Sequence, residues 1–252
     1  MTALNDPGLD EPRPNDSGLD DSGLDDGEPK GPRPDGHAFA GIAFDCDGVL
    51  ADTDEPWADA ERAVVERHGG RMTDALRDAT HGLGLAATVE LLATVMPGPV
   101  DHAALREELL REAAARVARA PAALPGAVET VAELARHWPV AVVSNSPAEV
   151  LRPLLASIGV LDLVRTTVAA DQVAEPKPAP HSYLEVARRV RLPPARMLAV
   201  EDSPTGVAAA RAAGCPVTGI AAPGRPHLAD ADRVLPDLPA LRRWLLGSPA
   251  PR

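Results

Sequence analysis

Short apolar runs alternate with helical patterns along most of this chain, beginning near residue 38. Candidate strands, most of them largely apolar, occur at 41–45, 140–144, 164–168, 197–201, 217–221 and 233–235. Helical spacing of apolar residues fills 126–137, 148–158, 180–191, 204–213 and 237–246. Apolar strands that alternate with amphipathic helices are typical of a parallel sheet covered on both faces. We therefore predict an α/β fold whose functional residues lie beyond the carboxyl ends of the strands.

The segment 54–121 interrupts this alternation, because it contains no strand-like run. Helical patterns fill 56–68, 86–95 and 101–119, and short segments rich in Gly and Pro separate them. We predict that 54–121 is an α-helical cap domain inserted after the first strand, and that 38–53 and 122–252 form the core domain. The two neighbouring connections would provide a hinge for the cap.

The first 37 residues have a different composition. They contain ten acidic and three basic residues, and no aromatic or β-branched residue other than Thr2. Such a segment buries too little apolar surface to offset the entropy lost on ordering. We predict that 1–37 is a disordered acidic tail, which either solvates the chain or binds a partner.

The overall composition limits the partners and the compartment. A formal net charge of −12 disfavours nucleic acid, whose phosphates require Lys and Arg surfaces. No apolar stretch approaches the ~20 residues of a membrane span, and the acidic start does not resemble a secretory signal. Cys46 and Cys215 form neither a disulfide framework nor a zinc-binding spacing. We predict a cytoplasmic protein, a monomer or weak dimer, without a membrane partner.

Two acidic residues follow the first predicted strand. Asp45 and Asp47 are two positions apart, so in an extended chain their side chains leave the strand in the same direction. Gly48 then permits a sharp turn. Two such carboxylates repel each other unless a cation or a shared proton intervenes. This pattern indicates a metal-assisted nucleophile beside an acid/base, and the alternative is a strand followed by a solvated acidic turn.

Polar residues of complementary kinds follow later strands. Hydroxyl and amide groups are neutral donors for phosphate oxygens, a lysine among prolines has a restricted backbone, and adjacent acids suit a cation. Each feature alone has a simpler explanation, such as a helix N-cap or a solvated lysine. The residues are Ser144, Asn145, Lys177, Glu201 and Asp202.

Together these residues resemble the haloacid dehalogenase superfamily over 40–246. The segment Asp-Cys-Asp-Gly-Val-Leu at 45–50, Ser144-Asn145, Lys177 within Pro-Lys-Pro, and Glu201-Asp202-Ser203 fit its four motifs in order. The helical insertion resembles the small cap of the phosphoglycolate phosphatase and β-phosphoglucomutase-like branch. The resemblance implies a Rossmann-like parallel sheet with an α-helical cap.

The resemblance also implies roles for the residues. Asp45 would be the nucleophile that forms an aspartyl-phosphate. Asp47 would protonate the leaving alkoxide and then activate water. Dehalogenases of the superfamily lack this second acid, because a halide leaves without a proton, so its presence favours phosphoryl transfer.

The remaining motif residues would bind the cation and the phosphoryl group. Mg²⁺, a hard cation that prefers oxygen ligands, would be held by Asp45, the backbone carbonyl of Asp47, and Asp202, with Glu201 adjacent or ligating. Ser144, Asn145 and Lys177 would hold the phosphoryl oxygens.

The cap bears on the substrate. In mutases of this branch, a cap loop after a Gly supplies a basic residue to a second phosphate. The matching loop here, 80–87, contains no Arg or Lys, and Pro147 stands where mutases have a Lys. We predict hydrolysis of a small phosphomonoester, such as a sugar phosphate, with His81, Gly82 and Leu83 as substrate contacts. The alternatives are a sugar phosphomutase and a non-catalytic binding protein on the same fold.

Overall fold

The computed structural model describes residues 39–80, 83–119, 122–221 and 228–247. The predicted tail (1–37) and two predicted substrate contacts, His81 and Gly82, lie outside these described residues.

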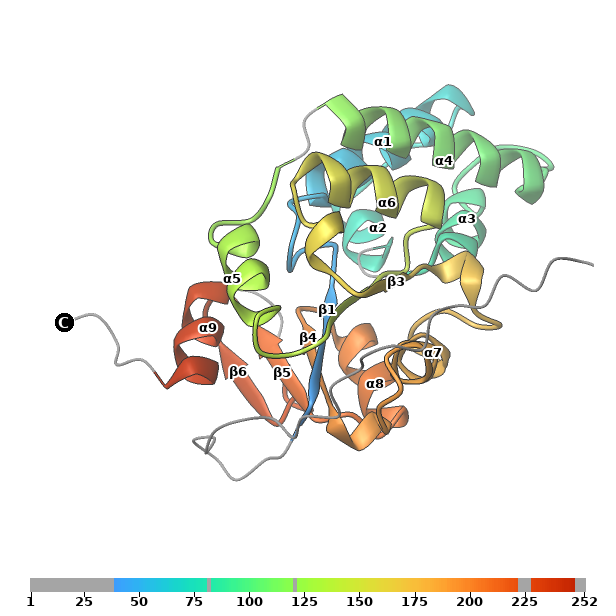
Figure 1. The fold of residues 1–252 in the computed structure, drawn as a ribbon. Helices are drawn as coiled ribbons and strands as arrows, with labels where there is room; N and C mark the ends of the chain where they lie inside the picture. The colour runs from blue at the N-terminus through green and yellow to red at the C-terminus, as the bar shows by residue number, and fades with distance from the viewer. Residues whose placement is uncertain (1–38, 81–82, 120–121, 222–227, 248–252) are drawn as a thin grey trace, which may run out of the picture. The chain divides into compact units, whose positions relative to one another are not determined.

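A six-stranded, fully parallel sheet forms the centre of the described fold (Figure 1). The strand order is β3-β2-β1-β4-β5-β6. The strands are β1 (Gly41–Asp45), β2 (Val140–Val143), β3 (Thr166–Val168), β4 (Met197–Glu201), β5 (Val217–Ile220) and β6 (Arg233–Leu235). All six predicted strands are present, and β3 starts later than predicted because Leu161–Leu163 form a 3-10 turn before it.

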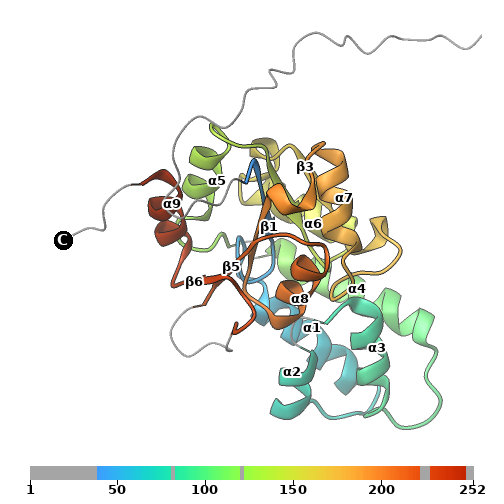
Figure 2. The same ribbon diagram turned by 90° about the horizontal axis from the view of Figure 1, so that it is seen from below.

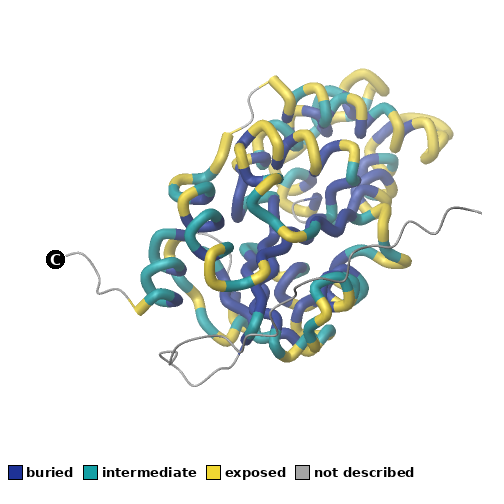
Figure 3. The backbone as a smooth tube through the Cα atoms, viewed as in Figure 1, coloured by how far each residue is buried: buried dark blue, intermediate teal, exposed yellow. Residues whose placement is uncertain are grey.

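Helices cover both faces of the sheet, as predicted. Along β1, Ile42 and Phe44 belong to one apolar core and Ala43 to the other, which is the alternation expected of a strand. The first core includes residues of α5 (Ala127–Leu134), α6 (Ala148–Ser157) and α9 (Leu238–Leu246), and the second those of α7 (His181–Arg189) and α8 (Pro204–Ala212). The three central strands are buried along their whole length (Figure 3).

Of the five helices between β1 and β2, the first four gather beyond the carboxyl end of β1 (Figures 1 and 2). They are α1 (Asp54–Arg67), α2 (Asp74–Thr80), α3 (Leu85–Ala93) and α4 (His102–Arg119). The helical insertion of the predicted fold class is therefore confirmed. Helix α2 was not predicted, because it has seven residues and buries only Leu76 and Thr80, which leaves little apolar periodicity.

The two ends of the insertion are bonded to each other. Asp52 N donates to Ala122 O and Leu124 N donates to Leu50 O, each at 2.9 Å. Between these bonds, Ala51 and Ala123 form an antiparallel bridge. The division of the chain into cap and core domains at 54 and 121 remains a prediction.

Among the described residues, no helix combines the length and the apolar composition that crossing a bilayer requires.

Candidate active site

The central position of β1 decides where the predicted site residues meet. In the ladders on its two sides, Asp45 pairs with Val143 of β2 and Phe44 pairs with Val200 of β4. The carboxyl ends of three strands are therefore neighbours, and the residues that follow each strand converge on one region.

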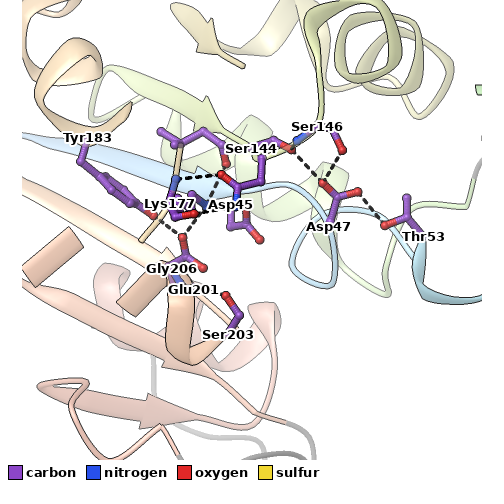
Figure 4. Close-up of polar contacts among 12 residues, drawn as sticks. Asp45, Asp47, Thr53, Ser144, Ser146, Lys177, Tyr183, Glu201, Ser203 and Gly206 are labelled. Atoms are coloured by element: carbon purple, nitrogen blue, oxygen red, sulfur yellow. Dashed lines mark hydrogen bonds and ion pairs between the residues drawn. The ribbon is translucent and has the colours of Figure 1, made fainter. Parts of the chain in front are cut away.

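A lysine lies between two carboxylates at this point (Figure 4). Lys177 Nζ is 2.7 Å from Asp45 Oδ1 and 2.6 Å from Glu201 Oε1. It also donates to the carbonyl oxygen of Val143, at 3.3 Å. All three charged side chains are buried. One cation thus holds both carboxylates in a setting where an unpaired charge is costly.

Burial and neighbouring charges change the acid–base properties of this group. Burial, together with the charge of Glu201, raises the pKa of Asp45 well above its usual value. Burial alone would lower the pKa of Lys177, but the Asp45 and Glu201 carboxylates raise it above its ordinary range. The hydroxyl of Tyr183 donates to Glu201 Oε1 at 2.5 Å, and burial is the main cause of its raised pKa. At neutral pH, Lys177 is therefore a cation and Tyr183 a neutral donor.

Asp47 has hydroxyl groups around it instead of charges. Its Oδ1 accepts a hydrogen bond from Thr53 Oγ1 at 2.7 Å. Its Oδ2 accepts from Ser144 Oγ at 2.8 Å and from Ser146 Oγ at 3.1 Å. Because a hydroxyl can donate or accept, these partners can hold the side chain with or without a proton. Asp45 and Asp47, although two residues apart, therefore have opposite surroundings.

The loop after β2 connects these groups to the lysine. Asn145 Nδ2 donates to Lys177 O at 3.1 Å, and Lys177 N donates to Asn145 Oδ1 at 2.9 Å. This reciprocal pair fixes the backbone from which the Lys177 side chain extends. Ser144 is fully buried against Asp47, whereas Asn145 and Ser146 line the cavity described below.

Three carboxylates lie close enough together to hold a metal ion. Asp45, Glu201 and Asp202 each offer an oxygen, and these oxygens lie within 4.8 Å of one another. Glu201 Oε2 is buried without a hydrogen-bond partner among the described residues, which is costly unless something binds there. The donor set, all oxygen, fits a hard divalent cation.

Two glycines make room for these carboxylates. A Cβ on Gly48, where φ is +82°, would lie 2.0 Å from Asp202 Oδ2. A Cβ on Gly206 would lie 1.9 Å from Glu201 Oε2. Ser203 is the N-cap of α8, accepting from Gly206 N at 3.0 Å, so the capping role considered for this motif belongs to Ser203.

A cavity of about 610 Å³ extends from this group to the helical insertion. Asp45, Asp47, Asp202, Asn145 and Lys177 line one end of it. The lining from the insertion side is Asp52, Thr53, Asp54, Glu55, Trp57, Ala58, Glu61, Arg77, Asp78, Thr80, Leu83, Leu85 and Thr88, and Ser146 and Ser203 complete the wall. The structure thus brings together all the described residues predicted for the site, with Ser144 and Glu201 just behind the wall.

Residues 39–214 match the family of haloacid dehalogenase-like hydrolases. The chain belongs to this family. The predicted resemblance is confirmed, and so is the predicted fold class.

Named relatives of this hydrolase are phosphatases. The chain is 31% identical over 202 residues to the validoxylamine A 7'-phosphate phosphatase of Streptomyces hygroscopicus subsp. limoneus, covering 79% of this chain and 94% of the relative. It is 30% identical to the fructose-1-phosphate phosphatase YqaB of Escherichia coli (strain K12), covering 70% and 93%. It is also 30% identical to a phosphoglycolate phosphatase of Shigella boydii, covering 71% and 80%.

One solved structure has a similar fold. CbbY from Rhodobacter sphaeroides, in complex with phosphate, superposes with a TM-score of 0.71 at 27% identity, over 81% of this chain and 96% of CbbY. The prediction that the hydrolase is an enzyme of the phosphoric monoester hydrolase class is confirmed.

Several cavity residues of this hydrolase escaped the sequence analysis. Thr53 contacts Asp47 and lies near the first motif, so proximity in the sequence was a usable signal. Ser146, one of the hydroxyls at the end of the second predicted strand, also contacts Asp47. Arg77 and Glu61 had no such signal, because they reach the cavity through the packing of α1 and α2. On α1 and just after it, Trp57 also lines the cavity, whereas Arg62 pairs with Asp59 and His68 with Glu108 outside its lining.

Proposed function

We propose that this hydrolase is a Mg²⁺-dependent phosphatase of a small phosphomonoester, such as a sugar phosphate, and that it acts through an aspartyl-phosphate. The observation that carries the proposal is the contrast between Asp45 and Asp47. Asp45 is held by Lys177 and faces the cavity, as a nucleophile requires. Asp47 is held by three hydroxyls that tolerate either protonation state, as an acid/base requires.

The reaction follows from these two surroundings. A carboxylate oxygen of Asp45 attacks phosphorus, the bond from phosphorus to the ester oxygen breaks, and Asp47 gives its proton to the leaving alkoxide. Asp47, now a carboxylate, takes a proton from a water molecule that attacks the phosphorus of the aspartyl-phosphate. Inorganic phosphate leaves, Asp45 is restored, and Asp47 is again protonated.

The other motif residues would bind the substrate and the cation. Lys177, with Asn145, Ser146 and Ser144 near it, would hold the phosphoryl oxygens. Asp45, the Asp47 carbonyl, Asp202 and Glu201 would hold Mg²⁺, which when bound supplies the positive charge that several converging carboxylates and a phosphoryl group need. The buried Glu201 Oε2, which has no hydrogen-bond partner in the described part of the chain, supports this assignment.

Hydrolysis is favoured over phosphomutase activity by the cavity wall and by the relatives. A mutase must bind a second phosphate, which normally requires Arg or Lys. Arg77 is the single Arg or Lys that the described residues of the insertion contribute to the cavity wall. It donates to Glu55 at 2.5 Å. The relatives named above are phosphatases of small phosphorylated compounds, which supports such a substrate here.

The setting that we propose for this activity is the cytoplasm. Cys46 and Cys215 are both buried and unpaired, which supports a reducing compartment. We expect a monomer or weak dimer, with no nucleic-acid or membrane partner.

The test uses purified protein and p-nitrophenyl phosphate, with and without Mg²⁺. We expect turnover that EDTA removes and Mg²⁺ restores, and we expect Asp45→Asn to abolish it while the circular dichroism spectrum stays unchanged. An Asp45→Asn variant that keeps more than a small part of the activity would contradict the aspartyl-phosphate. Rapid formation of glucose 6-phosphate from β-glucose 1-phosphate with a trace of the 1,6-bisphosphate would favour the mutase.

A further inference from the structure

The insertion side of the cavity is strongly acidic. Its ionisable residues are Asp52, Asp54, Glu55, Glu61, Asp78 and Arg77. Five carboxylates thus accompany one guanidinium among the described lining residues. Arg77 is already paired with Glu55, at 2.5 Å. The wall that faces the organic part of a bound phosphomonoester therefore has an excess of negative charge.

Burial distinguishes Glu61 from the other acids of this wall. Asp52, Glu55 and Asp78 are exposed, and water and salt screen charges of that kind. Glu61 is only 6% exposed, on the inner side of α1. Burial of most of this side chain removes part of its hydration, and burial accordingly raises the pKa of Glu61. Glu61 is therefore the acid of this wall whose charge would interact most strongly with a bound ligand.

One of the two carboxylate oxygens of Glu61 has a hydrogen-bond partner in the protein. Its Oε2 accepts a hydrogen bond from Thr80 Oγ1 at 2.7 Å. Its Oε1 has no hydrogen-bond partner among the described residues, although the side chain lines the cavity. A packed carboxylate with one open oxygen offers a fixed acceptor to a ligand, and a ligand donor would offset part of the cost of its burial.

We propose that the organic part of the substrate carries a protonated amine and that Glu61 binds it. This inference rests on the proposed function, since it names the substrate class of the same cavity. A hydroxyl would satisfy the hydrogen bond but not the excess charge. An ammonium group satisfies both, because a charge-assisted bond is about twice as strong as a neutral one. A second phosphate would meet repulsion from the same wall.

The test compares phosphomonoesters that differ only by an amine and a hydroxyl. The pairs are glucosamine 6-phosphate with glucose 6-phosphate, and ethanolamine phosphate with 2-hydroxyethyl phosphate. We expect kcat/KM for the amine to exceed that for its hydroxyl counterpart by roughly 10- to 100-fold in at least one pair, the range of a charged hydrogen bond. In Glu61→Gln the ratio should fall to about 1, because the turnover of the amine is selectively reduced.

Glu66→Gln is the matched control. Glu66 lies on the same helix, is exposed and is not part of the cavity lining, so its removal changes the net charge equally. We expect the wild-type ratio to persist in this variant. Equal kcat/KM for the amine and hydroxyl members of both pairs in the wild-type enzyme would overturn the proposal. So would an equal loss for both members in Glu61→Gln. Turnover of p-nitrophenyl phosphate by the wild-type enzyme tests the proposed function separately.

Discussion

The two ends of the cavity treat buried carboxylates differently. At the sheet end, Asp45 and Glu201 share Lys177, with both distances at or below 2.7 Å. At the insertion end, the hydroxyl of Thr80 is the one hydrogen-bond partner that the described residues give Glu61. In the first arrangement, Lys177 offsets part of the carboxylate charge and a bound cation would offset the rest. Such an arrangement suits a chemical step that is the same for every substrate. In the second arrangement, one oxygen of the Glu61 carboxylate has no hydrogen-bond partner among the described residues. This indicates that the ligand supplies a hydrogen-bond donor.

The largest effect that would sharpen this comparison is expected from Asp47→Asn. The amide keeps the shape of the side chain but cannot carry the proton between the leaving group and water. We expect kcat for p-nitrophenyl phosphate to fall by ~10²–10⁴-fold, the usual contribution of general acid–base catalysis. The circular dichroism spectrum and melting temperature serve as controls. A loss below tenfold would mean that Asp47 is not the acid/base.

The same difference explains what the sequence could predict. Asp45, Asp47, Lys177, Glu201 and Asp202 follow strands or lie in short motifs, and parallel strands bring their carboxyl ends together whatever the rest of the chain does. The three central strands, β1, β2 and β4, were predictable because each is a short, largely apolar run.

The insertion end depends on tertiary packing. Glu61 occurs within an amphipathic helix where a polar residue normally indicates solvent, and its burial results from the packing around α1 and the contact with Thr80. Helix α2, which brings Arg77 and Thr80 to the cavity, was itself not predicted. No local pattern specifies contacts of this kind.

Gly48→Ala is the next largest perturbation. The new Cβ would lie 2.0 Å from Asp202 Oδ2, so the carboxylate has to move away from the proposed cation site. We expect a ~10–100-fold weaker Mg²⁺ affinity, the range found when the support of a metal ligand is lost, measured by calorimetric titration and by the Mg²⁺ dependence of activity.

Gly98→Ala is a control for this variant. Gly98 also has a left-handed backbone, with φ +83°, but a Cβ there would have no heavy atom within 4 Å. It reports the cost of backbone strain alone. If both glycine variants weaken Mg²⁺ binding equally, the contact with Asp202 is not the cause.

Tyr183→Phe tests how tightly the sheet end is balanced. The variant removes the hydroxyl that donates to Glu201 Oε1 but leaves the bond from Lys177. We expect a loss of roughly 1.5 kcal/mol in the free energy of unfolding, typical of a hydrogen bond to a charged group. That corresponds to a fall of ~3–6 °C in melting temperature for a domain of this size. An unchanged melting temperature would mean that Glu201 needs no donor besides Lys177.

The smallest effect is expected from Glu61→Gln on stability, with the opposite sign. Burial raises the pKa of Glu61, so the folded protein binds this proton more tightly than the unfolded chain does. Ionised Glu61 therefore costs stability, and that cost appears as pH rises through the folded pKa. We expect the variant to melt a few degrees above the wild type at pH 8, about 1 kcal/mol.

The difference between the two proteins should shrink as pH falls from 8 toward ~4.3, the ordinary pKa of glutamate, and should be absent below it. Thermal melts at several pH values measure this trend. A Glu61→Gln variant that melts below the wild type at pH 8 would show that the protein itself stabilises ionised Glu61, which would contradict this prediction.

The bridge between Ala51 and Ala123 has a consequence for how such a protein can diversify. The two ends of the insertion are hydrogen-bonded to each other close to the sheet. The insertion therefore leaves the sheet and returns to it at one place, whatever its length. The entropy of closing a longer loop rises only slowly with its length. Duplication, recombination or deletion within this segment can therefore give the cavity a new wall while the inherited strand-end chemistry remains intact.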